Sequence, residues 1–139
     1  MIMWQTYALL SAIFAALTAI FVKLGIQNID SNLATAIRAF FILCMLLLIV
    51  FCNGTIKDIR HLPHSAWLFL FLSAIATGLS WLFYFKALQL GEVARVAPVD
   101  KLSVPLAVLF AFLFLGEKVG WQIILGASLV TAGSLILLL

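Results

Sequence analysis

The fold is decided by the segment at residues 33–52, which reads LATAIRAFFILCMLLLIVFC. Arg38 is the only charged residue in it. A helix that crosses the hydrocarbon core of a bilayer needs roughly 20 mostly apolar residues, and this segment has that length. Its apolar side chains do not alternate with polar ones, as the strands of a membrane β-barrel would over about 10 residues. The segment therefore predicts a transmembrane α-helix.

Four more apolar runs of similar length occur along the chain, separated by turn-forming residues. We expect the five membrane-spanning helices at residues 3–22, 33–52, 66–85, 95–115 and 120–139. Five such helices use about 100 residues and leave little for anything else. The sequence thus predicts an all-α polytopic membrane protein, made of one five-helix domain over residues 1–139.

The composition agrees with a membrane protein and excludes several other classes. Of the 139 residues, 66% are hydrophobic and 9% are charged, against roughly 45–50% and about 25% in globular domains. So few polar residues could not cover a soluble domain.

Several kinds of functional site are also not expected. Eight basic residues without a basic run are too few for a nucleic-acid surface. His61 and His64 stand without a cysteine or carboxylate cluster, so we expect no metal site. Motifs of hydrolases and nucleotide-driven enzymes are missing, so we expect neither an enzyme nor a cofactor.

The orientation in the membrane is weakly encoded. Trp4, Trp67 and Trp121 stand at the starts of the first, third and fifth predicted helices, which predicts one interfacial aromatic belt. Each side of the membrane receives three flanking cations: Lys57, Arg60 and Lys118 on the side of the N-terminus, and Lys23, Lys86 and Arg95 on the other. The positive-inside rule then gives almost no preference. Insertion in both orientations would produce this balance, and so would a determinant of insertion that these counts miss.

Three charges cannot be moved out of the predicted helices. After Arg38 only residues 39–52 are apolar, which is too short to span, so Arg38 lies about 8 Å along its helix. The same reasoning places Asp100 and Lys101 more than a turn inside the fourth helix. A charge near the bilayer centre costs at least about 2.5–3.5 kcal/mol, and such side chains usually face a cavity or a partner. Arg38 and Lys101 could instead extend to the interface, but Asp100 is too short for this.

Pro98 and Pro105 flank the charged pair in the fourth helix, and each lacks an N–H. A broken helix with polar residues is tolerated in a membrane where it is buried in protein or lines water. We therefore predict a functional break here, with a simple proline kink as the alternative.

Hydroxyl groups form a stripe on the third helix, beside Trp81. Its members follow a spacing of four, three and four residues: Ser73, Thr77, Ser80 and Tyr84. This stripe is interpreted as a wall of a substrate cavity, although hydrogen bonds between helices would use it equally well. Small residues on the fifth helix, among them Ala127, Thr131 and Ser134, predict a packing seam.

Two motifs connect these residues with a known family. Residues 86–105 read KALQLGEVARVAPVDKLSVP, and residues 114–118 read FLGEK. They resemble the second half of an EamA-type unit of the drug/metabolite transporter superfamily, and the length resembles its small five-helix bacterial and archaeal branch. The resemblance implies that this chain corresponds to one half of a ten-helix inverted-repeat transporter. The ten-helix members are mostly exporters or exchangers of small metabolites in the inner membrane. The resemblance also implies a second copy of the chain, and the balanced cations permit an antiparallel homodimer.

From these observations we expect a small-solute transporter that works as a dimer by alternating access in a prokaryotic inner membrane. The membrane glutamate that four-helix multidrug relatives carry in their first helix is missing here, which argues against exchange of drug cations for protons. Two cations and one carboxylate in the predicted cavity favour an anionic or zwitterionic substrate. A non-transporting subunit of a hetero-oligomer and a flippase for a lipid-linked substrate are the alternatives.

Overall fold

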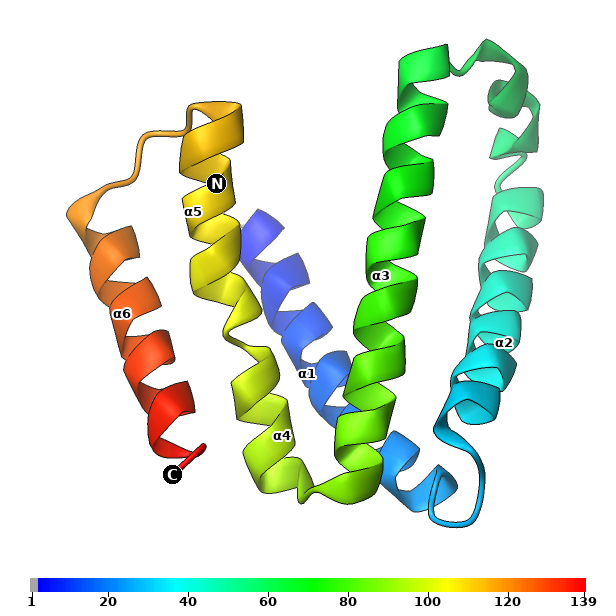
Figure 1. Ribbon diagram of the computed structural model, residues 1–139. Helices are drawn as coiled ribbons and strands as arrows, with labels where there is room; N and C mark the ends of the chain where they lie inside the picture. Colours follow the sequence, from blue (N-terminus) through cyan, green and yellow to red (C-terminus); the bar gives the residue numbers. More distant parts are fainter. Residues whose placement is uncertain (1–2) are drawn as a thin grey trace. The chain divides into compact units, whose positions relative to one another are not determined.

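The computed structural model describes residues 3–139, and in this range it consists of helices and connecting turns without a strand (Figure 1). The elements are α1 (Met3–Gly25), α2 (Ser31–Cys52), the 3₁₀ helix η1 (Thr55–His61), α3 (His64–Leu90), α4 (Val93–Asp100), α5 (Ser103–Leu115) and α6 (Trp121–Ile136). The prediction of an all-helical chain is confirmed. The helices start and end within a few residues of the predicted ones, and the largest extension is at the end of α3.

Four helical stretches are long and apolar enough to cross a membrane: α1, α2, α3, and α4 together with α5. The remaining predicted helix corresponds to α6, which is apolar but has 16 residues. At 1.5 Å per residue it extends about 24 Å, less than the roughly 30 Å of a hydrocarbon core. The count of five crossing helices, and with it the resemblance to half of a ten-helix transporter, stays a prediction.

The long helices are apolar on all sides. At most 11% of the most apolar 18-residue window of each crossing helix is buried within the chain. Phe83 and Leu115, for example, are each 73% exposed. Side chains of this kind need lipid or another protein around them, because water would make their exposure costly. The chain is therefore a multi-pass membrane protein.

The chain divides into two compact units, which are described separately. One contains the helix up to Lys23 together with Leu90–Leu139, and the other contains Leu24–Gln89. The single five-helix domain expected from the sequence stays a prediction.

In the unit of residues 24–89, α2 and α3 run in opposite directions and are joined through η1 (Figure 1). Asp30 caps α2, and its carboxylate accepts hydrogen bonds from the N–H groups of Asn32 (2.9 Å) and Leu33 (3.0 Å). This cap explains why α2 begins before the predicted residue 33. At the same end, Gln89 Nε2 donates to the carbonyl of Ile29 at 3.0 Å, which ties the last turn of α3 to the loop before α2.

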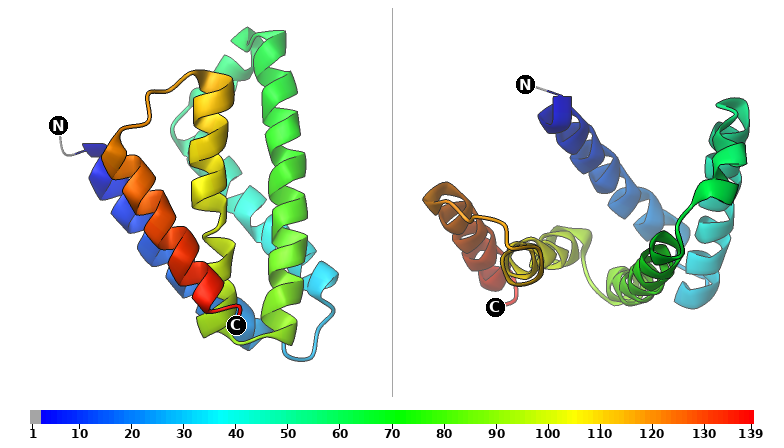
Figure 2. Two further views of the ribbon diagram at one scale, coloured as in Figure 1. Left: turned by 60° about the vertical axis from the view of Figure 1, so that its left-hand side comes forward. Right: turned by 90° about the horizontal axis from the view of Figure 1, so that it is seen from above.

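In the other unit, α6 returns alongside α5 and α4 (Figure 2). The turn that makes this possible begins at Gly116, whose φ of +67° is a left-handed conformation that glycine adopts without strain. The N–H groups of Gly116 and Glu117 both donate to the carbonyl of Ala111 and so close the end of α5. At the end of α1, Lys23 Nζ donates to the carbonyl of Gly91 at 2.7 Å.

Candidate functional site

The break between α4 and α5 follows from the proline at position 105. Because Pro105 has no N–H, it cannot donate to the carbonyl of Lys101 as a helical residue would. The N–H of Val104 takes that carbonyl instead, at 2.9 Å, and the N–H of Leu102 bonds to Val99 at 3.0 Å. Both are i to i−3 bonds, so the chain tightens into 3₁₀ geometry at this point. The α-helix is consequently interrupted at Lys101 and Leu102, between the two prolines.

The carbonyl of Pro98 finds a partner on another helix. Its regular donor would be Leu102, which is engaged with Val99. Pro98 O accepts instead from the N–H of Lys101 at 3.0 Å and from Ser134 Oγ at 2.8 Å. Ser134 belongs to α6 and is buried, with 4% of its surface exposed. The residue was predicted only as part of a packing seam, and the structure shows that it satisfies a carbonyl beside the break.

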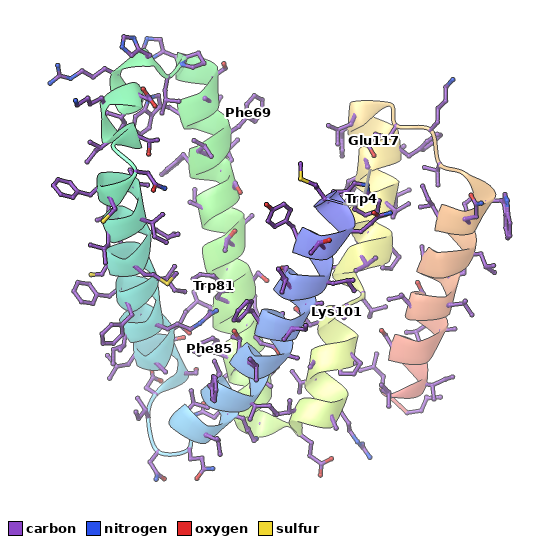
Figure 3. All side chains as sticks on the ribbon, turned by 180° about the vertical axis from the view of Figure 1, so that it is seen from behind. Trp4, Phe69, Trp81, Phe85, Lys101 and Glu117 are labelled. Carbon is purple, nitrogen blue, oxygen red and sulfur yellow. The ribbon has the colours of Figure 1, made fainter. Side chains whose placement is uncertain are left out.

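The charged pair sits at the interruption itself. Asp100 ends α4 and Lys101 is the first residue of the break (Figure 3). Lys101 Nζ and Asp100 Oδ2 are 3.4 Å apart, which forms an ion pair between sequence neighbours. Both side chains are partly open, with 53% of the Lys101 side chain and 36% of the Asp100 side chain exposed. The two charges thus offset each other while staying accessible from outside the unit.

Arg38 has a different environment, in the hairpin of α2 and α3. Its guanidinium carbon lies 4.4 Å from the ring centroid of Trp81 and 5.5 Å from that of Phe85. Trp81 and Phe85 are one helical turn apart on α3, so both rings face the same neighbour (Figure 3). These distances fit cation–π contacts, which are formed most strongly with indole. Phe85 was missed by the sequence analysis, although its spacing of four residues from Trp81 points to it.

Of the residues predicted for the cavity wall on α3, Trp81 contacts Arg38. Trp81 and Tyr84 are half-buried, and Trp81 contacts the guanidinium. Ser73, Thr77 and Ser80 are exposed on the surface of α3. A role for these three in a cavity wall stays a prediction.

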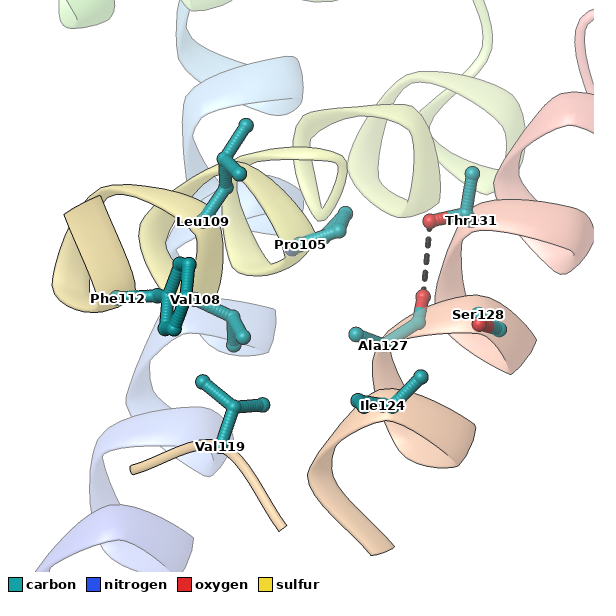
Figure 4. Close-up of a pocket in the computed structure, with 9 residues that line it drawn as sticks. All are labelled: Pro105, Val108, Leu109, Phe112, Val119, Ile124, Ala127, Ser128 and Thr131. Atoms are coloured by element: carbon teal, nitrogen blue, oxygen red, sulfur yellow. Dashed lines mark hydrogen bonds between the residues drawn. The ribbon is translucent and has the colours of Figure 1, made fainter. Parts of the chain in front are cut away.

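A groove of about 400 Å³ runs between α5 and α6 (Figure 4). Apolar side chains such as Val108, Phe112 and Ile124 line it. Of the site residues predicted from the sequence, Pro105 lines the groove. Thr131 also reaches the groove, but its hydroxyl donates to the carbonyl of Ala127 at 2.8 Å, within its own helix. The groove therefore offers mainly apolar contact.

The three predicted intramembrane charges fall into two groups. Asp100 and Lys101 belong to the unit with α4–α6, whereas Arg38 belongs to the unit of residues 24–89. A single cavity that contains all three stays a prediction. Within residues 3–139 no group of three or more His, Cys, Asp or Glu side chains could hold a metal ion.

The structure has four helical stretches that are long and apolar enough to cross a membrane, and one of them is interrupted beside the Asp100–Lys101 pair. These features define a multi-pass membrane protein, and an interrupted helix of this kind is typical of transporters. The chain belongs to the EamA-like transporter family, whose model matches residues 2–139. A protein from Sinorhizobium sp., described as an uncharacterized transporter in the cobO 3' region, is 52% identical over 134 residues. The similarity covers 96% of this chain and 95% of that protein. No solved structure matches.

These comparisons confirm the family resemblance drawn from residues 86–105 and 114–118. They also confirm a transporter rather than an enzyme.

Proposed function

We propose that this protein is a secondary transporter that exports or exchanges a small metabolite across a prokaryotic inner membrane by alternating access. The observation that carries the proposal is the break between α4 and α5, where an apolar helix is interrupted next to the Asp100–Lys101 pair. Interrupted helices in membranes occur where the backbone is buried in protein or lines a watery path, and in transporters such helices form the substrate site.

The hydrogen bonds at the break would allow α4 and α5 to change their angle. Lys101 and Leu102 are held by short i to i−3 bonds and not by the full helical ladder. The carbonyl of Pro98 is satisfied from α6 by Ser134, so the interruption does not leave that group unpaired. A change in the angle between α4 and α5 would therefore disturb few hydrogen bonds, as alternating access between two sides requires.

A second copy of the chain completes the proposed transporter. The crossing helices are almost entirely exposed within one chain, which leaves their surfaces available for a partner. We include α6 as a fifth crossing helix, because Leu137–Leu139 extend it as an apolar end. With an odd number of crossings and balanced flanking cations, two copies in opposite orientations would form an inverted pair, as in transporters with inverted repeats.

The test is transport by the purified protein in proteoliposomes, measured as exchange of a panel of labelled amino acids and organic acids. We expect flux of at least one compound in the wild type, and a loss of at least ten-fold in Arg38→Ala and in Lys101→Ala. Lys118→Ala is the matched control, because Lys118 lies in the exposed loop after α5, and it should keep its flux. Unchanged flux in both Arg38→Ala and Lys101→Ala would overturn the assignment of these residues.

Orientation can be tested separately with two reporters fused to the C-terminus. One reporter is active only in the cytoplasm, and the other is active only on the opposite side of the membrane. Signals from both reporters are expected for an antiparallel pair. A single clean orientation would contradict the antiparallel dimer, and together with a lack of flux it would favour a non-transporting subunit.

A further inference from the structure

We propose that Arg38 is the substrate-recognition residue for an oxyanion, and that the transported solute carries a carboxylate or a phosphoryl group that binds to the edge of its guanidinium. This inference rests on the proposed transport function and adds the chemical class of the substrate and the residue that selects it.

The first argument is the way the guanidinium is held. Trp81 and Phe85 approach it with their rings, at 4.4 and 5.5 Å between its central carbon and the ring centroids. A guanidinium has five N–H donors in its own plane, where they form a rigid fork that fits the two oxygens of a carboxylate or phosphate. The aromatic contacts thus hold the group without using its donors.

The second argument is charge. The unit of residues 24–89 contains two carboxylates, and neither forms an ion pair with Arg38. Asp30 caps the start of α2 through bonds to two backbone N–H groups, and Asp58 belongs to η1, beyond the opposite end of α2. A cation inside a membrane helix is costly and normally has a counter-charge. Within its own unit Arg38 has aromatic contacts but no carboxylate partner, and an anionic ligand would supply the counter-charge.

The third argument is the residue type. Lysine could not replace arginine here, because an ammonium group neither stacks as a plane nor binds two oxygens at once.

The experiment uses the fluorescence of Trp81 in the whole protein, in lipid nanodiscs. Trp4, Trp67 and Trp121 are replaced by Phe; each lies exposed in the first turn of its helix, so Trp81 becomes the reporter. Acetate, succinate and inorganic phosphate are titrated as probes, with choline chloride at matched ionic strength. We expect a saturable change of emission with at least one anion and none with choline.

Variants connect the signal to Arg38. Arg38→Lys keeps the charge and should weaken anion binding at least ten-fold, while Arg95→Lys, at an exposed arginine 67% open at its side chain, should leave it unchanged. Equal binding in Arg38→Lys and wild type would overturn the proposal, as would the lack of a saturable response to all three anions. A response that follows the phosphatidylglycerol content of the nanodisc and is insensitive to the soluble anions would assign Arg38 to a lipid phosphate, and would overturn it as well.

Flux separates this inference from the proposed function. Transport that persists in Arg38→Lys and shows no preference for anions would leave the transporter intact and disprove the oxyanion site. Saturable anion binding that depends on Arg38, without flux of any bound anion, would support the site and disprove transport.

Discussion

The two units of the molecule hold the charges of their apolar helices in opposite ways. In one, Lys101 and Asp100 are sequence neighbours whose charged atoms are 3.4 Å apart, so the cation and the anion offset each other within the chain. In the other, Arg38 rests on the faces of Trp81 and Phe85 and has no carboxylate partner within its unit. Aromatic rings lower the cost of a cation, but they leave its net charge in place.

This difference suggests a division of roles. A pair of neighbouring charges needs no outside group, and its location at the break of α4 and α5 associates it with the proposed change of helix angle. An arginine whose charge is not balanced nearby still attracts an anion. The comparison therefore predicts that the pair responds to the loss of one member more strongly than Arg38 responds to the loss of one ring.

The largest effect is expected for Lys101→Met. The substitution leaves the Asp100 carboxylate without its cation in a helix that crosses the membrane, where an unpaired charge costs about 2.5–3.5 kcal/mol at the centre. We expect the free energy of unfolding to fall by up to about 3 kcal/mol on this scale. Reversible unfolding by sodium dodecyl sulfate in mixed micelles measures it.

The double variant Lys101→Met/Asp100→Asn is the control for this effect. Removing both charges eliminates the unpaired carboxylate, so most of the lost stability should return. If the double variant is as unstable as the single one, the ion pair is not what stabilises the break.

A smaller effect is expected for Trp81→Ala. The substitution removes the stronger of the two aromatic contacts of Arg38, which is worth about 1–2 kcal/mol for a cation with little water around it. Trp81→Phe keeps a ring and should lose less than half of that. The same unfolding assay measures both variants. Trp67→Ala, in the first turn of α3 and half exposed, is the matched control, and an equal loss there would show that Arg38 does not depend on Trp81.

The sequence predicts the helices well because their signal is simple. Long apolar runs such as residues 33–52 must be surrounded by lipid or protein, and turn-forming residues separate one run from the next. The run at residues 95–115 contains Pro98 and Pro105, which lack the N–H groups that a continuous helix needs, and α4 ends and α5 begins between them. The boundaries were less accurate, because a cap such as Asp30 extends a helix beyond its apolar part.

The contacts between helices could not be predicted in the same way. Arg38 was identified as unusual, but its partner rings are more than 40 residues away, and only the packing of α2 against α3 brings them to it. Ser134 looked like one small residue among several on its helix. Its bond to Pro98 depends on how α6 packs against α4, which no pattern within either helix shows.

The smallest effect is expected for Ser134→Ala, which removes the side-chain donor to the carbonyl of Pro98. Hydrogen bonds between membrane helices are worth about 0.6 kcal/mol on average, so the free energy of unfolding should fall by about that amount. The remaining bond from the N–H of Lys101 keeps the carbonyl satisfied. The change should therefore be seen more clearly in the motion of the break than in stability.

That motion can be measured by hydrogen exchange at the amides of Lys101 and Leu102. We expect faster exchange in Ser134→Ala than in wild type, because the hydroxyl that ties α6 to the last turn of α4 is gone. Ser128→Ala is the matched control, since Ser128 is an exposed serine on the same helix and should leave the exchange as it is. Equal exchange in all three proteins would mean that α6 does not restrain the break, and the two charge environments would then differ only in their electrostatics.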